Sequence, residues 1–317
     1  MGDPAGIGPE IVLKCIAQGL PAPAIIYGDA GRLANVAARL GIDVEIATIT
    51  SAKAATGRKG WAEVIDIGPS VADVAWGVVD ARAGQAAYDY VCAAIDDARR
   101  GALRGIVTAP LNKASMHAAH IDFPGHTEIL AQRTDTRDFA MMLANDELRV
   151  LLATIHIALA DVPRAITPES QWRAIMLAER ACRQMGIAHP RVAVAGLNPH
   201  AGEAGKFGRE EIDTIVPAIA QARTRGIDVS GPWPGDTVFM RARQGEFDIV
   251  VAQYHDQGLI PVKYLGLDHG VNVTVGLPFV RTSVDHGTAF DIAGQGIADH
   301  ASLMAAFELA CRMTPAR

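Results

Sequence analysis

Apolar and polar positions alternate along the chain in a way that predicts strands separated by helices. Short apolar runs with the length of strands lie at residues 24–28, 44–48, 105–109, 191–196 and 247–252. Segments with apolar residues at helical spacing lie at residues 31–40, 81–100, 167–186, 210–225 and 301–313. Two further runs, 139–144 and 148–155, flank a polar turn and predict a hairpin. The pattern predicts an α/β fold whose sheet is mixed rather than wholly parallel.

The chain opens with a glycine-rich loop, GDPAGIG, followed by Pro9 and Glu10, which suit the first turn of a helix. Such a loop normally follows a strand, and no strand precedes it. We therefore expect that the chain begins one strand late, at a misassigned or shortened start. The loop does not have the GxGxxG spacing, so it gives no support to a Rossmann fold.

Composition narrows the class of protein. Half of the 317 residues are hydrophobic and 20% are charged, which predicts a globular core of about two domains or one large α/β unit. A net charge of −6 without a basic block argues against nucleic acid or an anionic membrane as partner. No apolar run has the length of a membrane span and no signal segment is present, so we expect a cytoplasmic protein. The four cysteines are far apart and predict free thiols.

Candidate chemistry is densest between residues 253 and 296. The apolar run 247–252 leads directly into His255 and Asp256, as a buried strand does when it ends at a ligand site. Lys263, Asn272 and Arg281 follow, which we place in loops punctuated by Gly and Pro and which suit an anionic substrate. The preceding stretch 231–237 is also rich in Gly and Pro and is expected to be irregular.

Three histidines share one context, because His156, His200 and His255 each follow a predicted strand. If these strands are parallel neighbours, their ends meet, and three imidazoles there can hold Zn²⁺ or a similar divalent ion with an open position. Each of them alone is more often a hydrogen-bonded structural histidine. Asp256 can orient a ligand or a metal-bound water, or accept a proton, and is our candidate for a catalytic role.

Two further segments predict binding. His126 and Thr127 lie at the expected N-terminus of a helix, a natural anion site, although capping alone would explain Thr127. The stretch Asp285-His286-Gly287-Thr288 precedes residues 290–294, which we expect to be helical. A bound metal would suit oxidation of an alcohol, and the hydride would then need a nicotinamide acceptor.

Taken together, these motifs resemble the 4-hydroxythreonine-4-phosphate dehydrogenase (PdxA) family. The matching segments are GDPAGIGPE, PGHTE, LRVLLATIH, GLNPHAGE, FGREEIDTI, YHDQGLIPVKY and GVNVTVGLPFVRTSVDHGTAFDIAG. They follow one another over nearly the whole chain. The segment HGTAFDIAGQGIAD is also similar to the cofactor loop of isocitrate and isopropylmalate dehydrogenases.

The resemblance implies an isocitrate/isopropylmalate dehydrogenase-like fold over residues 1–317, with two interleaved subdomains and the active site in the cleft between them. It implies a homodimer with a shared active site, a divalent metal (zinc, with magnesium or cobalt as alternatives) and NAD or NADP. The positions that it implies are His156, His200 and His255 for the metal, and His126, Thr127, Lys263, Asn272 and Arg281 for the substrate. Those that it implies for the cofactor are His286, Gly287, Thr288 and Asp291.

The implied reaction is NAD(P)-dependent oxidation of 4-phosphohydroxy-L-threonine in pyridoxal phosphate synthesis. The segments TAPLNK and GPWPGDTVF resemble a paralogous branch that acts on D-threonate or D-erythronate 4-phosphate. A metal-dependent hydrolase or lyase of a phosphorylated acid is the alternative from another class, and a sugar-phosphate sensor is a third. A hydrolase has no use for the HGTAFDIAG loop, and a sensor has none for three metal-type histidines.

Overall fold

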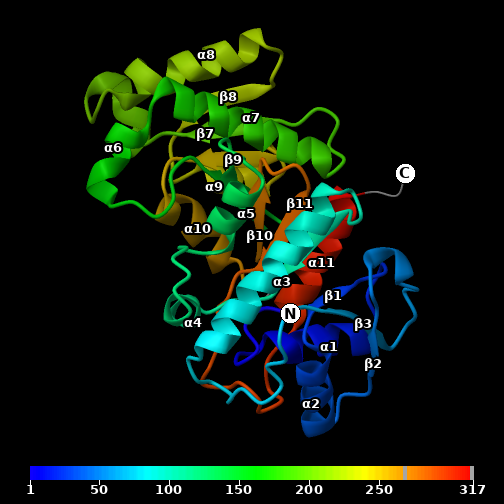
Figure 1. Ribbon diagram of the computed structural model, residues 1–317. Helices are drawn as coiled ribbons and strands as arrows, with labels where there is room; N and C mark the ends of the chain where they lie inside the picture. The colour runs from blue at the N-terminus through cyan, green and yellow to red at the C-terminus, as the bar shows by residue number, and fades with distance from the viewer. Residues whose placement is uncertain (267–269, 315–317) are drawn as a thin grey trace. The chain divides into compact units, whose positions relative to one another are not determined.

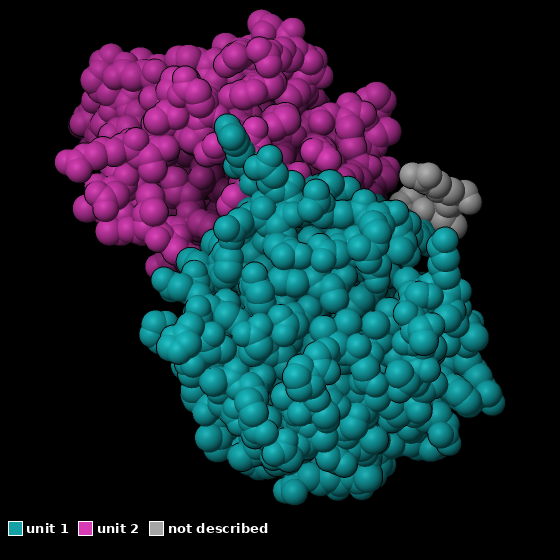
Figure 2. All heavy atoms as spheres, viewed as in Figure 1, with its two compact units in different colours: residues 1–137, 277–317 teal, residues 138–276 magenta. Residues whose placement is uncertain are grey.

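The computed structural model describes residues 1–266 and 270–314, and the chain divides into two compact units (Figure 2). Unit 1 comprises Met1–Arg137 and Leu277–Arg317, and unit 2 comprises Asp138–Gly276. Unit 2 is therefore an insertion, and unit 1 is built from two separate stretches of chain. The chain passes from unit 1 to unit 2 at residues 137–138 and returns to unit 1 at residues 276–277.

Unit 1 contains a three-stranded parallel sheet in the order β1-β3-β2 and a parallel pair of β4 with β11 (Figure 1). The strands are β1 (Ile26–Gly28), β2 (Glu45–Thr48), β3 (Trp61–Asp66), β4 (Gly105–Thr108) and β11 (Val280–Val284). The helices are α1 (Gly8–Gln18), α2 (Ala30–Leu40), η1 (Ala52–Ala54), α3 (Ala81–Arg99), α4 (Lys113–Ala118), α5 (His126–Arg133) and α11 (Ala301–Met313).

Unit 2 contains six strands in the order β10-β5-β6-β9-β7-β8. Strand β5 is antiparallel to both neighbours, and the pairs from β6 to β8 are parallel. The strands are β5 (Ala140–Ala144), β6 (Arg149–Leu152), β7 (Val192–Ala195), β8 (Val229–Trp233), β9 (Ile249–Ala252) and β10 (Val271–Val275). The helical segments are η2 (Leu159–Asp161), α6 (Val162–Ala165), α7 (Pro168–Gln184), η3 (Pro199–Gly205), η4 (Glu211–Ile215), α8 (Val216–Thr224), α9 (Val238–Arg243) and α10 (His255–Tyr264).

Local sequence explains where these elements begin. Helix α3 starts after Asp80, whose side chain accepts a hydrogen bond from the backbone N–H of Arg82. Helix α7 starts with a capping box between Thr167 and Ser170, with Pro168 in the first turn. Strand β9 is buried along its whole length, as its uninterrupted apolar sequence predicts. The described residues include no helix both long and apolar enough to cross a membrane.

The predicted mixed α/β fold and the hairpin of β5 and β6 are confirmed, but several local predictions are wrong. Residues 229–233 form strand β8, which tolerates proline because among the described strands it lies at the edge of its sheet and pairs with β7. Asn272 and Arg281 lie in strands and Lys263 in a helix, not in loops. Residues 290–294 form turns rather than a helix, with backbone hydrogen bonds that reach three residues back, such as that from Ala293 to Phe290.

Candidate functional site

Unit 1 holds a buried cation at Arg281 on strand β11, where only 3% of the residue is exposed. One guanidinium nitrogen, Nη2, donates a hydrogen bond of 2.7 Å to Oγ1 of Thr108 on β4. Burial lowers the pKa of Arg281 to about 10, and the charge of Glu128 opposes that shift. The group therefore stays protonated at neutral pH, and a charge kept in such a place suits an anionic ligand.

His126 and Thr127 begin helix α5, with Gly125 at the N-cap. Burial, then the charges of Arg281 and of the chain N-terminus, hold the pKa of His126 well below its usual range. Parts of the residue remain exposed, but Nε2 is covered and has no hydrogen-bond partner among the described residues. A neutral imidazole with an unused ring nitrogen, beside a cation and a helix N-terminus, can accept or donate one hydrogen bond to an anion.

The predicted cofactor segment contains three exposed residues and one buried residue that attaches it to the rest of unit 1. His286, Gly287 and Asp291 are exposed, whereas Thr288 is buried. The carbonyl of Thr288 accepts a hydrogen bond from the backbone N–H of Ile7 at 3.0 Å, and its hydroxyl accepts one from Asn112 at 3.3 Å. Thr288 thus fixes the segment to the glycine-rich N-terminal loop. The exposed three remain available to a ligand.

Unit 2 brings His156 and His255 together. They follow β6 and β9, which are parallel neighbours, and their ring centroids are 5.8 Å apart. Nδ1 of His255 lies 2.7 Å from a carboxylate oxygen of Asp256. That pairing fixes the ring and leaves Nε2 for another partner, an arrangement usual for metal-binding histidines. The pair therefore fits two ligands of one divalent ion.

His200 follows the third strand, β7, but does not join this pair. Its ring packs against Phe207, with centroids 6.1 Å apart. In the described parts of the chain, no group of three or more His, Cys, Asp or Glu side chains is arranged to hold a metal. One chain thus presents two of the three predicted ligands in one place and the third elsewhere.

The turn that carries His200 is left-handed. Within η3, residues 200–204 all have positive φ, between 42° and 80°. Only Gly202 among them adopts such a backbone without strain, and each L-residue costs roughly 1–2 kcal/mol in that region. Strain of this kind is often stored where function requires it.

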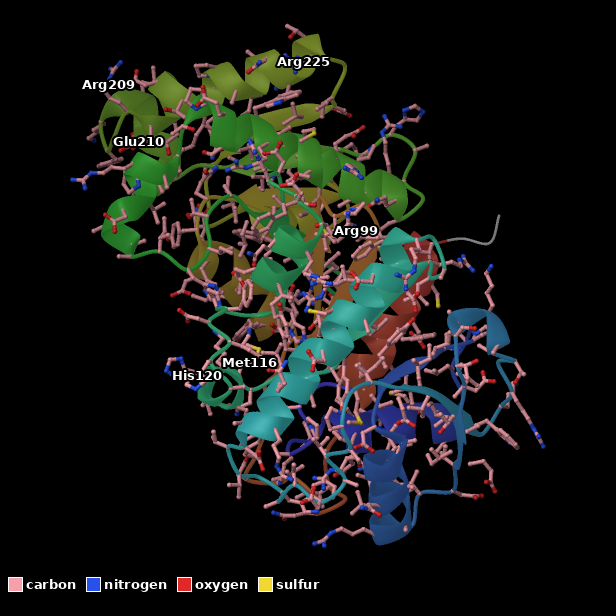
Figure 3. The ribbon with its side chains drawn as sticks, viewed as in Figure 1. Arg99, Met116, His120, Arg209, Glu210 and Arg225 are labelled. Carbon is pink, nitrogen blue, oxygen red and sulfur yellow. The ribbon has the colours of Figure 1, made fainter. Side chains whose placement is uncertain are left out.

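Glu211 is the group that holds this turn. It is 2% exposed, and its Oε1 accepts hydrogen bonds from the backbone N–H groups of Leu197 at 2.8 Å and Asn198 at 2.7 Å. Its Oε2 accepts one from the Asn198 side chain at 3.0 Å. The neighbouring Glu210 accepts a hydrogen bond from that same side-chain nitrogen at 2.7 Å, and Figure 3 labels it beside Arg209 in the segment before η4.

The other predicted substrate residues lie in unit 2. Lys263 is partly buried in the last turn of α10, the helix that begins at His255. Asn272 lies in β10 opposite Leu143, and its Nδ2 donates to the sulfur of Met141 at 3.2 Å. Its buried Oδ1 has no partner within the described residues, so it can accept a hydrogen bond from a ligand.

Our reading of the sequence missed two residues of these sites, Thr108 and Glu211. Both side chains are buried, and a buried hydroxyl or carboxylate requires partners. Thr108 is the polar residue at the end of the apolar strand β4, which is a signal in the sequence, whereas Glu211 lies in the polar sequence EIDTI and carries no such signal. What the sequence could not indicate was which partner each one meets.

Comparisons with known proteins first define the class of protein to which the chain belongs. A relative from Beijerinckia indica, named 4-hydroxythreonine-4-phosphate dehydrogenase, is 55% identical over 99% of this chain and 93% of its own length. One from Cupriavidus necator, named D-threonate 4-phosphate dehydrogenase, is 48% identical over 98% of this chain and 96% of its own. The solved 4-hydroxythreonine-4-phosphate dehydrogenase of Klebsiella pneumoniae has a TM-score of 0.93 at 45% identity, covering 99% of this chain and 96% of that one. The chain is an oxidoreductase of this dehydrogenase class.

The family follows from a second comparison. A family profile described as "Pyridoxal phosphate biosynthetic protein PdxA" matches residues 20–310. The chain belongs to this family, as its motifs predicted.

Proposed function

We propose that the protein oxidises the 3-hydroxyl of 4-phosphohydroxy-L-threonine with NAD or NADP in the cytoplasm. The product, 2-amino-3-oxo-4-phosphooxybutanoate, then loses CO2 to give 3-amino-2-oxopropyl phosphate. The observation that carries the proposal is the pair His156 and His255, 5.8 Å apart at the ends of adjacent strands in a chain of this family.

Unit 1 supplies groups for the anionic part of the substrate. Arg281 offers a buried guanidinium, held by Thr108. Neutral His126 offers Nε2, and Thr127 offers a hydroxyl at the same helix N-terminus. In unit 2, Lys263 and Asn272 add a cation and an amide oxygen. The exposed residues His286, Gly287 and Asp291 are assigned to the nicotinamide cofactor, which accepts the hydride when bound.

His156, His200 and His255 are assigned to a divalent metal, with zinc as the first candidate. Bound there, the ion would lower the pKa of the substrate hydroxyl and polarise the carbonyl that forms. Asp256 holds Nδ1 of His255 and so directs Nε2 toward the ion. Because His200 lies apart from the pair, we assign it to the site of the partner subunit in a homodimer.

Exposed apolar side chains around all three histidines support a homodimer. Ile157, next to His156, is 45% exposed, and Phe207, which packs on His200, is 43% exposed. On helix α10, which begins at His255, Ile260 is 63% exposed and Tyr264 is 90% exposed. Such side chains at a functional site are typical of a surface that another protein covers.

Subunit mixing tests this assignment. Dimers formed from equal amounts of His255→Ala and His200→Ala chains should recover about a quarter of the wild-type activity, because half of them are mixed and each mixed dimer has one intact site of two. Mixing His156→Ala with His255→Ala chains is the matched control and should recover none. If no mixture recovers activity, each metal site is built within one chain.

A panel of substrates tests the reaction itself. The purified protein with NAD or NADP should turn over 4-phosphohydroxy-L-threonine, and exhaustive removal of metal with EDTA should abolish the activity. D-threonate 4-phosphate is the second candidate substrate, because relatives of that name are almost as similar to this chain as the first. Turnover of D-threonate 4-phosphate alone would select that branch. Absence of any nicotinamide binding by fluorescence titration would instead favour a hydrolase or lyase.

A further inference from the structure

Lys14, on helix α1, holds the stretch of chain that follows the predicted cofactor residues. We call this stretch, residues 294–298, the link segment, because it leads from them toward helix α11. Nζ of Lys14 donates hydrogen bonds to the carbonyls of Gly296 and Ala298, at 2.9 and 2.7 Å. It donates a third to Oε1 of Glu10, one turn earlier on α1, at 2.8 Å. The same Oε1 accepts the backbone N–H of Ala298 at 2.9 Å.

Arg39 and Trp76 hold the other end of the link segment. Nε of Arg39, on helix α2, donates a hydrogen bond of 3.2 Å to the carbonyl of Gly294. The ring of Trp76 lies so close to Gly294 that a Cβ there would approach it to 2.6 Å, and the backbone has a φ of 75°. Glycine adopts this conformation at this distance without strain. Every second carbonyl from residue 294 to 298 therefore accepts a hydrogen bond from a cationic side chain of another element.

The pair of Lys14 and Glu10 is better explained by the position it imposes than by stability. Glu10 is fully buried, and its second oxygen, Oε2, has no hydrogen-bond partner among the described residues. Desolvation of a buried ion pair often cancels its attraction, so apolar side chains of similar size would stabilise the fold as well. What apolar side chains cannot do is bind two particular carbonyls of a loop.

The link segment also determines where Asp291 lies. The side chain of Gln295 donates a hydrogen bond of 2.7 Å to the carbonyl of Asp291. On the other side, Thr288 is attached to the glycine-rich N-terminal loop. Residues 289–294 are thus fixed at both ends, with the exposed Asp291 between them. A Cβ on Gly287 would meet no atom within 4 Å, so there is room for a ligand beside this segment.

We propose that Lys14 and Arg39 are positioning residues for the nicotinamide cofactor and act through the link segment. This inference rests on the proposed function, which assigns His286, Gly287 and Asp291 to that cofactor. While the two cations hold the link segment, these residues keep one arrangement before the cofactor binds, and binding need not order them. Without the cations, only a fraction of the molecules has that arrangement, and the apparent Kd rises by the inverse of that fraction.

Fluorescence titration with NADH and with NADPH tests the proposal without turnover. Arg39→Met should raise the Kd of the nucleotide that binds by about three- to tenfold, and Arg39→Lys, which keeps a donor for Gly294, should recover most of the loss. Arg99→Met is the matched control. Arg99, labelled in Figure 3, also donates a side-chain hydrogen bond to a backbone carbonyl of unit 1, that of Arg133 at 3.0 Å. The control should bind nucleotide as tightly as the wild type.

Lys14→Met should have the larger effect, about tenfold or more, because two carbonyls lose their donor. It also leaves the Glu10 carboxylate buried without its cation, so the double variant Glu10→Gln, Lys14→Met replaces it if the single variant does not fold. Hydrogen exchange at the amide of Ala298 should become faster without any nucleotide present. In steady state, KM for the nucleotide should rise, while KM for the phosphorylated substrate and kcat at saturating nucleotide should change less than about twofold.

Wild-type nucleotide affinity in Arg39→Met and in the folded Lys14 variant would overturn the proposal. An equal rise of Kd in Arg99→Met would also overturn it, since it would indicate a general loss of stability. So would an equal rise in KM for the phosphorylated substrate, because the substitutions would then disturb the whole site. If the wild type itself binds neither NADH nor NADPH, the proposed function is refuted, and this inference with it.

Discussion

Glu211→Gln should detach the turn that carries His200 while leaving the fold intact. In the structure, the carboxylate accepts three hydrogen bonds, two of them from the backbone N–H groups of Leu197 and Asn198. An amide has only one oxygen. Whichever way it is oriented, its NH2 group faces at least one donor, so at least one bond is lost and a donor is left without an acceptor.

The magnitude follows from two opposing terms. Four non-glycine residues of the turn are left-handed, which costs roughly 4–8 kcal/mol in total. Three hydrogen bonds to a charged acceptor contribute about 1.5–3 kcal/mol each, which is of similar size. Losing one of these hydrogen bonds removes a large part of the free energy that offsets the backbone strain, so the turn should relax to a less strained conformation. Loss of a group that orients a metal ligand typically costs about 10–100-fold in metal affinity.

Metal affinity is the direct readout. Competition with a chromophoric chelator should show Zn²⁺ binding to Glu211→Gln about 10–100-fold weaker than to the wild type, with little change in far-UV circular dichroism. Glu210→Gln is the control, because among the described residues the hydrogen bond that Glu210 accepts comes from the Asn198 side chain and not from the backbone. Wild-type affinity in Glu211→Gln would refute the reasoning, as would an equal loss in both variants.

Three further outcomes are expected. Lys263→Ala should raise KM by about tenfold or more with little change in kcat, if its charge contacts the phosphate equally in the ground and transition states. Asp256→Asn should lower kcat more than about tenfold while the metal, measured by elemental analysis, stays bound; a normal kcat would leave Asp256 a purely structural role. The pKa of His126 is lowered in the folded state, so its contribution to stability is present above a pH of about 6.5 and is lost as the pH falls below it. Urea denaturation should therefore show that the free energy of unfolding falls less between pH 7.5 and pH 5.0 in His126→Gln than in the wild type. An equal fall in both proteins would contradict this.

The sequence predicted the elements well where the hydrophobic period was clear. The last helix has the expected bounds, Ala301–Met313, and the three strands before the histidines are parallel neighbours as expected. The prediction that Asn272 and Arg281 lie in loops was wrong. Glycines and prolines nearby suggested loops, although Val271, Val273 and Val275 alternate as they do in a strand.

The position of His200 could not have been predicted from local pattern. Strand order correctly placed it at the same sheet edge as the other two histidines. Its orientation depends on a left-handed turn, and that turn depends on Glu211, thirteen residues beyond Asn198. Contacts of that range arise from tertiary structure and leave no period in the sequence.

The insertion of unit 2 into unit 1 has a consequence for synthesis on the ribosome. Ala140 and Val275, near the two ends of unit 2, are paired in adjacent strands, so this unit can complete its sheet from one continuous stretch. Strand β4, by contrast, must wait for β11 until all of unit 2 has been made, roughly ten to thirty seconds at usual elongation rates. The nascent chain therefore exposes the edge of β4 that later pairs with β11 during that interval, while unit 2 can already complete its own sheet. Chaperone binding during translation should fall mainly on the first 137 residues.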